Sequence, residues 1–505
     1  MDILSSIQAS LQPGVLLTMI GGSTLGIICG AIPGLTATMA VALVLPATFV
    51  LNPEMGLAML LAVYVGATYG SSISAILLNI PGTPASMMTG VDGHPLARQG
   101  MAGKALGIAT FTSFFGGVMS GAILIILAPI LGRTALKFGP AEFFAIGVFA
   151  LSLIAGMMAD NIFKGLIAGL IGVFVGSVGI DPLTGAARYT FGVTALAGGL
   201  QLVPMLVGYF GFREVLNQIC QCRVEFNVVE QVSRLIPTWA DFKRVFPTVI
   251  RSGLLGTYVG ILPGAGGPIA SFMAYDVEQR INGKRFGTFG KGEICGVAAS
   301  ETANNGVNGG ALIPLLTLGV PGDGATAVML GAFMMQNIIP GPTLFTKYPA
   351  LVNSIYVNYM ISCVLMLVIG LLGAKLFMQV IKVPQTILVP IVATICFVGS
   401  YSIRNSLFDV GVMVAVGSVA FVMERRRFPV IAAVLGTILS SMIELRFRGA
   451  LQIDPSGRIF FEKPICLALL VLSAILFIRP FWKQYIKGVF LKPRSPEPAS
   501  ANHEE

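Results

Sequence analysis

The chain has 505 residues, of which 55% are hydrophobic and 11% are charged, and its mean hydropathy is +0.84. A soluble protein carries about a quarter charged residues, so this composition excludes an ordinary soluble domain. The formal net charge of +9 does not point to nucleic acid, because Lys and Arg in a membrane protein gather in cytoplasmic loops and report its topology first.

Apolar segments long enough to span a bilayer, roughly 20 residues each, recur along the whole chain. Clear examples are residues 108–131, 141–159, 356–381 and 465–481. We therefore predict an all-α polytopic membrane protein with about 11–12 membrane segments. The first residues, MDILSSIQAS, lack the basic region of a cleavable signal peptide, so the first span is expected to serve as its own insertion signal.

The first apolar segment contains GAIPGLTATMAVALVLP (30–46), in which a Pro-Gly pair interrupts a stretch of membrane length. Proline removes a backbone donor, and glycine loosens the chain. Irregular backbone at membrane depth is tolerated only where it is buried in protein or lines a wet cavity. Four such breaks occur, at Pro33-Gly34, Pro81-Gly82, Pro263-Gly264 and Pro321-Gly322.

The breaks belong to an internal repeat. Residues 26–34 and 256–264 share the pattern G-x-x-x-G-x-x-P-G, and residues 70–86 align with residues 310–326, which places the second break on the fourth. Similarity continues around residues 132–140 and 373–384. Because several matches occur in the same order and spacing, we predict two repeats that cover residues 20–210 and 250–445.

Charge predicts how the two repeats are oriented. The triple-arginine run 425–427, the basic linker after residue 210 and the basic C-terminal tail are expected in the cytoplasm. The counterpart of the triple-arginine loop is the loop 181–188, and one span, 191–210, separates that loop from the linker, so it is expected outside. Inverted repeats follow, as in many secondary transporters. The expected division is repeat one at 1–210, a cytoplasmic linker at 211–249, inverted repeat two at 250–445, an extra span at 446–481 and a cytoplasmic tail at 482–505.

Each break is expected to start a half-helix, whose free N–H groups and positive dipole end suit an anion. A single Pro-Gly pair can serve helix packing alone, but two symmetric pairs followed by hydroxyl residues or glycines favour a binding site. The predicted substrate-binding residues are Pro33, Gly34, Thr36, Thr38, Ser71, Ser72, Pro81, Gly82, Thr83, Pro263, Gly264, Gly266, Gly267, Ser271, Asn304, Asn305, Pro321, Gly322 and Thr326.

The run AASETANNGVNGGA (298–311) is the most polar stretch between apolar segments. Asn and Gly favour turns, so the run could be an ordinary turn. The repeat register instead aligns it with a segment that looks embedded in the membrane, where the carboxylate of Glu301 is costly unless paired or protonated. We predict Glu301, Asn304, Asn305 and Asp323 as ligands of a coupling ion, Na+ or H+. Asp323 could equally cap its half-helix.

Catalytic motifs are missing from the sequence. It has no phosphate-binding loop and no zinc-protease motif, and the one His outside the tail, His94, stands beside no obvious nucleophile. We expect neither an enzyme nor a transition-metal site, and no cofactor besides the coupling ion.

Three segments carry a resemblance to a known family: GAIPGLTATMAVALVLP, YGSSISAILLNIPGTPASMMTGVDGHPLARQG and GILPGAGGPIASFMAYDVEQR. They resemble TctA, the large membrane subunit of the tripartite tricarboxylate transporters, and the resemblance extends to the C-terminal tail. Its first motif falls on Pro33, Gly34 and Thr36, and the counterpart of this motif falls on Pro263, Gly264 and Gly266.

The resemblance implies three components in a bacterial inner membrane system. A periplasmic, TctC-like protein would capture the solute, and a small TctB-like membrane subunit would accompany this chain. Citrate or other di- and tricarboxylates would be imported with Na+ or H+. Two other classes stay open on the residues alone: a gradient-independent channel built on paired re-entrant loops, and an intramembrane enzyme, against which the lack of a catalytic cluster argues.

Overall fold

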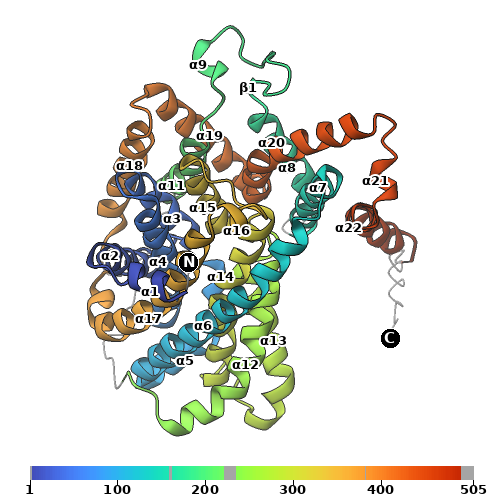
Figure 1. Cartoon of the computed structure of the whole chain (residues 1–505). Coiled ribbons are helices and arrows are strands. Elements are labelled where there is room, and N and C mark those ends of the chain that lie inside the picture. The colour runs from blue at the N-terminus through green and yellow to red at the C-terminus, as the bar shows by residue number, and fades with distance from the viewer. Residues whose placement is uncertain (1–2, 158–161, 221–234, 381–382, 491–505) are drawn as a thin grey trace, which may run out of the picture.

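The computed structural model describes residues 3–157, 162–220, 235–380 and 383–490, and these form an almost wholly helical protein (Figure 1). Within the described residues the strands are two, β1 (Gly179–Ile180) and β2 (Ala187–Arg188), which pair as an antiparallel hairpin. In the same described part of the chain, six helical segments are long and apolar enough to cross a bilayer, and shorter apolar helices accompany them. The prediction of an all-α polytopic membrane protein is confirmed.

The elements before the linker are α1 (Ile3–Ser10), α2 (Pro13–Ala31), α3 (Ala37–Val44), η1 (Leu45–Val50), α4 (Pro53–Leu78), η2 (Pro84–Ser86), α5 (Met87–Leu96), η3 (Ala97–Met101), α6 (Ala102–Ala135), α7 (Pro140–Met157), α8 (Ile162–Gly176), α9 (Thr194–Ala197), α10 (Leu202–Leu206), η4 (Val207–Phe212) and α11 (Arg213–Cys220). Those after it are α12 (Trp239–Ile261), α13 (Gly266–Phe286), α14 (Ile294–Leu318), α15 (Gly324–Met335), α16 (Leu344–Lys347), α17 (Pro349–Val380), α18 (Gln385–Ser402), α19 (Leu407–Arg425), α20 (Val430–Ile453), α21 (Ile459–Glu462) and α22 (Pro464–Phe490).

Glycines bring α2 and α4 into backbone contact. A Cβ placed on Gly26 would clash with the carbonyl oxygen of Val63, and one on Gly30 would clash with that of Ala67. Small residues spaced by four therefore let the two helices approach more closely than larger side chains allow.

The same contact recurs between α12 and α14. A Cβ on Gly256 would meet the carbonyl oxygen of Ala303, and one on Gly260 would meet that of Val307. The G-x-x-x-G pattern thus performs one packing role in both repeats, and the two helix pairs are structural counterparts.

The central helices of the two repeats touch each other. Helices α4 and α14 are counterparts in the sequence alignment. The Thr68 hydroxyl donates to the Asn308 side chain, and one turn earlier on α4 the Tyr64 hydroxyl donates to Asp323, which follows the end of α14. These two hydrogen bonds join the repeats at the centre of the molecule.

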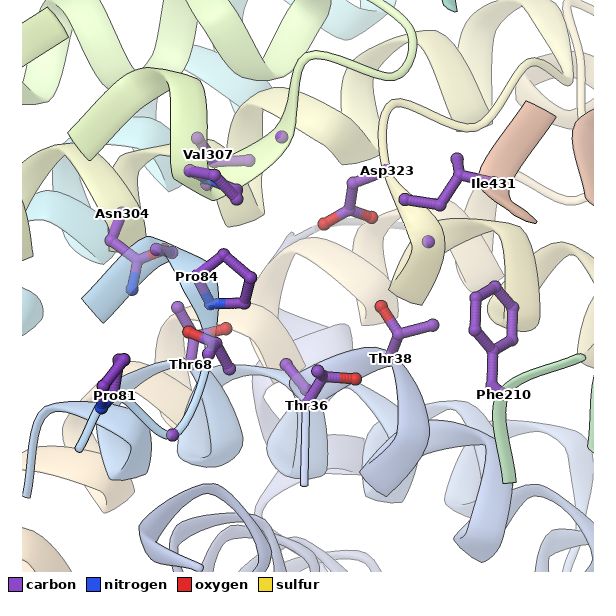
Figure 2. A pocket seen from close by; sticks show the side chains of 18 of the residues that line it. Thr36, Thr38, Thr68, Pro81, Pro84, Phe210, Asn304, Val307, Asp323 and Ile431 are labelled. Atoms are coloured by element: carbon purple, nitrogen blue, oxygen red, sulfur yellow. The ribbon is translucent and has the colours of Figure 1, made fainter. Parts of the chain in front are cut away.

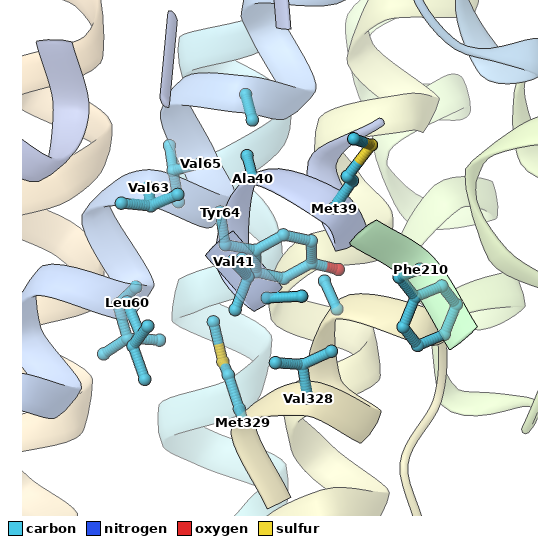
Figure 3. Packing of buried hydrophobic residues seen from close by; sticks show 14 of the residues in the cluster. Met39, Ala40, Val41, Leu60, Val63, Tyr64, Val65, Phe210, Val328 and Met329 are labelled. Atoms are coloured by element: carbon cyan, nitrogen blue, oxygen red, sulfur yellow. The ribbon is translucent and has the colours of Figure 1, made fainter. Parts of the chain in front are cut away.

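The helices of the two repeats are interleaved around this centre. Helix α6 packs along α14, and its counterpart α17 packs along α4. The ring of Tyr64 is buried among residues of α3, α4 and α15, including Val41, Val328 and Met329 (Figure 3). A core shared by both repeats holds the breaks in place.

A second group of helices lies beside this core. Helices α7, α8, α20 and α22 pack on one another at the upper right of Figure 1. The β1–β2 hairpin is tied to α20 through Asp181, which forms an ion pair with Arg188 and accepts a hydrogen bond from Arg448. Hydrogen bonds from Thr184, Arg448 and Arg188 hold the pKa of the Asp181 carboxyl well below its usual range, so this tie persists at neutral pH.

Four expected boundaries differ from the structure. The span expected at 191–210 is irregular up to residue 201 apart from the short α9, because Gly192 and Gly199 adopt positive φ angles that end helices. A helix then runs from Leu202 through η4 to Cys220, so residues 211–220 are not a linker, and α12 begins inside the expected linker at Trp239. The C-terminal span starts at Pro464 rather than 446, since α20 continues past that point.

Candidate functional site: a cavity at four helix breaks

A new helix begins after each of the four breaks. Thr36 caps α3, with its hydroxyl accepting the N–H of Met39 at 3.2 Å. Thr83 and Asp323 occupy equivalent positions and cap η2 and α15, each in a reciprocal capping box. Helix α13 begins at the glycine pair after the third break. The expected half-helices are therefore present.

The break backbones are also alike in the two repeats. Gly34 has φ +90° and Gly264 has φ +78°, a left-handed conformation that favours glycine. Gly82 and Gly322 both lie where a Cβ would come within 2.6 Å of a carbonyl oxygen, on α2 and α12 respectively. Glycine is required at each break by backbone geometry, and the sequence repeat reflects this requirement.

The four half-helix starts line one cavity of about 510 Å³. Figure 2 shows Thr36 and Thr38 on one side of this cavity and Asn304 and Asp323 on the other. The lining residues are Gly34, Thr36, Ala37, Thr38, Tyr64, Thr68, Pro81, Gly82, Thr83, Pro84, Ala85, Met87, Phe210, Arg213, Glu214, Asn217, Gly264, Gly266, Gly267, Pro268, Asn304, Val307, Asn308, Asp323, Gly324, Glu424 and Ile431.

The cavity lies where the two repeats meet. Thr68 and Asn308 are equivalent in the repeat alignment, and their side chains touch at 3.2 Å. The equivalent pairs Tyr64 with Asn304, and Thr83 with Asp323, all line the cavity. Substrate sites at a repeat interface, formed by discontinuous helices, are typical of secondary transporters.

Two amide groups in the cavity wall are buried donors. Asn304 is 3% exposed and Asn308 is 1% exposed. The side-chain nitrogen of each is buried, and among the described residues neither has a hydrogen-bond partner. Buried donors are nearly always satisfied in native proteins, because leaving one unpaired costs about 1–3 kcal/mol. These amides suit the oxygen atoms of a ligand in the cavity.

Asp323 is an acid at the same wall. Its carboxylate accepts the N–H of Thr326 at 2.8 Å and the hydroxyl of Tyr64 at 2.5 Å. It therefore caps α15 and joins α15 to α4. The two roles left open by the sequence are compatible, because a cap that lines the cavity can also face a ligand.

Glu301 lies outside the cavity in a closed polar cluster. It is fully buried, and its two carboxylate oxygens accept hydrogen bonds from Thr89 at 2.5 Å and from Ser113 at 2.9 Å. The Asn305 amide donates to Ser113 at 2.8 Å. The polar run 298–311 is the buried interior of α14, so the alternative of an ordinary turn is wrong.

The predicted site residues divide into two sets. Those that line the cavity are Gly34, Thr36, Thr38, Pro81, Gly82, Thr83, Gly264, Gly266, Gly267, Asn304 and Asp323. Those that do not line it are Pro33, Ser71, Ser72, Pro263, Ser271, Glu301, Asn305, Pro321, Gly322 and Thr326.

The second set has clear local reasons. Ser71 and Ser72 bond back to carbonyl oxygens of their own helix, because the turn of α4 that faces the cavity is the one before them. Ser271 donates to the Ser300 carbonyl oxygen at 3.2 Å. The prolines and Gly322 shape the breaks from behind the cavity wall.

Residues that the sequence reasoning missed fall into two groups. Tyr64, Thr68 and Asn308 line the cavity, and helical periodicity would have selected two of them, since Asn308 follows Asn304 by one turn and Thr68 is its counterpart. The other group consists of charged residues from α11 and α19. Their placement depends on tertiary contacts that no local pattern reports.

That charged group lies at the cavity's edge. Arg213 approaches Glu424 at 3.5 Å and Glu214 at 3.8 Å, and Asn217 donates to Glu424 at 2.6 Å. The Arg213 Nε is buried and has no hydrogen-bond partner among the described residues. Arg213 thus forms two long ion pairs, one with each of these acids.

Two helical repeats with broken helices around one central cavity are an architecture typical of multi-pass membrane transporters. The chain belongs to the tripartite tricarboxylate transporter TctA family, whose model matches residues 16–435. It is 35% identical over 478 residues to an "Uncharacterized 52.8 kDa protein in TAR-I ttuC' 3'region" of Agrobacterium vitis, covering 94% of this chain and 95% of the relative.

A second Agrobacterium vitis relative, an "Uncharacterized protein in TAR-II ttuC' 3'region", is 35% identical over 224 residues. That match covers 44% of this chain and 92% of the relative. No solved structure gave a significant match. Family membership points to a transporter subunit rather than an enzyme.

Proposed function

We propose that this chain is the large transmembrane subunit of a secondary active transporter that imports organic anions, such as citrate and other di- or tricarboxylates. The observation that carries the proposal is the convergence of four half-helix starts on one cavity. Helix N-termini offer free N–H groups and a positive dipole end, so together they form an anion site that needs no dedicated cation.

Polar side chains complement these backbone groups. The buried amide donors of Asn304 and Asn308 suit carboxylate oxygens, and Thr36 and Thr38 line the side of the cavity opposite Asn304 (Figure 2). Arg213 supplies a positive charge at the edge. A volume of about 510 Å³ accommodates a small polycarboxylate with some water.

The family supports the rest of the assembly. A TctB-like small membrane subunit and a TctC-like periplasmic solute-binding protein are the proposed partners, and the bacterial inner membrane, with the C-terminus in the cytoplasm, is the proposed location. A Na+ or H+ gradient would drive accumulation. Rocking or sliding of one repeat against the other would expose the cavity alternately to the two sides.

The test is uptake into proteoliposomes that hold this chain and its small partner subunit, with and without the binding protein. Labelled citrate, malate and succinate are supplied under an imposed Na+ or pH gradient. Accumulation that requires both gradient and binding protein is expected. Equilibration without accumulation would identify a channel instead, and the absence of flux for every carboxylate would overturn the proposal.

A further inference from the structure

Glu301 occupies a site that the substrate cavity does not explain. It lies on α14 of the second repeat, and its two hydrogen-bond donors come from the first repeat, Thr89 on α5 and Ser113 on α6. The carboxyl group therefore joins the two repeats. Under the proposed function the two repeats move relative to each other during transport. The charge on an acid between them would therefore change how strongly they are held together.

The cluster contains no compensating cation. Glu301 is fully buried, and no described Lys or Arg forms an ion pair with it. The hydrogen-bond donors to its carboxylate oxygens are the two neutral hydroxyl groups. A carboxylate in such surroundings is costly unless it gains a proton or binds a cation.

The neighbouring ionisable groups are engaged elsewhere. Tyr69 on α4 hydrogen-bonds Thr110, and Asp92 on α5 accepts the amides of the loop before α14 and the hydroxyl of Tyr275 on α13. Lys104, near the start of α6, pairs with Asp241 of α12. Arg251 of α12 pairs with Glu278 of α13, and Arg133 lies at the far end of α6. None of these contacts neutralises Glu301.

Fold symmetry does not require an acid here. The repeat alignment that places residues 70–86 on 310–326 makes Leu61 the counterpart of Glu301, and Leu61 is 3% exposed in the same helix position of α4. An aliphatic side chain therefore satisfies this packing position in one repeat. The acid in the other repeat calls for a chemical role.

We infer that Glu301, held by Thr89 and Ser113, is the proton-binding site of this transporter, separate from the substrate cavity. The inference rests on the proposed function and names its coupling ion. Both carboxylate oxygens already accept hydrogen bonds from hydroxyl groups, at 2.5 and 2.9 Å. A fully buried carboxylate with no described Lys or Arg paired to it is most directly stabilised by a proton, so we assign H+ rather than Na+.

The cluster is linked to the cavity through two short paths. On α14, Asn304 lines the cavity and lies one turn beyond Glu301. On α5 and η2, Ala85 lines the cavity and lies one turn before Thr89. Protonation of Glu301 alters its hydrogen bond with Thr89. Because Thr89 lies one turn after Ala85, this alteration would shift the half-helix start that lines the cavity.

The test compares Glu301→Gln with the wild-type chain in proteoliposomes that contain the partner subunits. Glutamine has nearly the same shape and still bonds both hydroxyls, but it cannot gain or lose a proton. We expect that the variant still exchanges labelled citrate for unlabelled citrate, while pH-gradient-driven accumulation falls to the level seen without a gradient. The matched control is Glu54→Gln. Glu54 lies on α4 outside the cluster, and its carboxylate accepts a hydrogen bond from Ser354 at 2.7 Å. This variant is expected to accumulate substrate like the wild type.

Three results would overturn the assignment. One is normal pH-driven accumulation by Glu301→Gln. Another is loss of exchange together with accumulation, which indicates a structural role. The third is wild-type accumulation that follows a Na+ gradient at equal pH and ignores a pH gradient.

An infrared measurement separates this inference from the proposed function. A buried protonated carboxylic acid gives its own carbonyl band, which should be present in the wild-type protein and absent in Glu301→Gln. If the uptake experiment shows that no carboxylate is transported, the proposed function fails, but the infrared band would still support the proton site. Absence of the band across the accessible pH range would overturn the assignment of Glu301 as the proton site.

Discussion

The two repeats of this protein share a backbone and differ in chemistry. Their helix pairs approach at the same glycines, and their breaks contain glycines of the same conformation. At the cavity, however, the equivalent side chains differ. Repeat one has Tyr64, Thr68 and Thr83 at the positions where repeat two has Asn304, Asn308 and Asp323. Symmetry is thus confined to the parts that shape the backbone.

Under the proposed function, this difference would let a symmetric scaffold bind an asymmetric ligand. Equivalent half-helices supply the same N–H groups from two sides, which attract negative charge without discrimination. The side chains then differ, so under the proposed function a bound polycarboxylate would have one preferred orientation. The ionisable group of the buried cluster, Glu301, also belongs to repeat two alone, since its counterpart is Leu61.

The largest expected effect tests the shared backbone. Gly264→Leu places a side chain at φ +78°, where left-handed backbone costs about 1–2 kcal/mol, and fills the cavity. The N–H of Gly264 also donates to the Gly322 carbonyl oxygen at 2.7 Å, which ties the two breaks of repeat two together. We expect uptake to be abolished while membrane insertion is retained.

The control for this variant is Gly411→Leu. Gly411 is an exposed glycine on α19 with open space around its Cα, so the same added bulk is harmless there. Wild-type uptake by a correctly inserted Gly264→Leu variant would show that ligands do not approach the break.

The next effect tests the asymmetry. Asn308→Ala and Asn304→Ala each remove one buried amide donor. A hydrogen bond to a charged group contributes about 1.5–3 kcal/mol, so the substrate concentration for half-maximal uptake should rise about tenfold to a hundredfold. Thr68→Val is the matched repeat-one variant. It keeps the side-chain volume and should raise the substrate concentration for half-maximal uptake by a smaller factor. Equal increases for the variants of the two repeats would mean that both repeats bind the substrate alike.

Much of this arrangement was predictable from the sequence, for a physical reason. Pro-Gly pairs and G-x-x-x-G spacing act locally, through missing donors, backbone conformation and close approach, so the breaks and the repeat are visible in one chain. The helix start at Leu202 was misjudged because glycines near residue 199 look apolar in composition yet end a helix. Glu301 and Arg213 could be placed only by their partners on distant helices.

A smaller effect concerns the acid in the cavity wall. Asp323→Asn keeps an oxygen that caps α15 but removes a negative charge beside the ligand. We expect a modest gain in affinity, larger for tricarboxylates than for dicarboxylates, because less repulsion remains. Concentration dependence of uptake for citrate and succinate measures this difference. Loss of gradient-driven accumulation with intact exchange would instead place Asp323 in the coupling machinery.

The smallest effect on transport concerns orientation. Arg426→Cys, in a background without other cysteines, should leave uptake unchanged, because Lys164 bonds only the backbone carbonyl oxygen of Arg426. An impermeant maleimide should label it from the cytoplasmic side alone. Labelling from outside intact cells would reverse the inverted-repeat topology derived from charge.

This labelling result also fixes the direction in which the cavity opens. Glu424 lines the cavity, its side chain is 43% exposed, and it lies two residues before Arg426. If residue 426 faces the cytoplasm, the edge formed by Arg213 and Glu424 faces the cytoplasm too. The structure would then represent an inward-facing state. Closing that edge while opening the opposite one is the movement that transport requires.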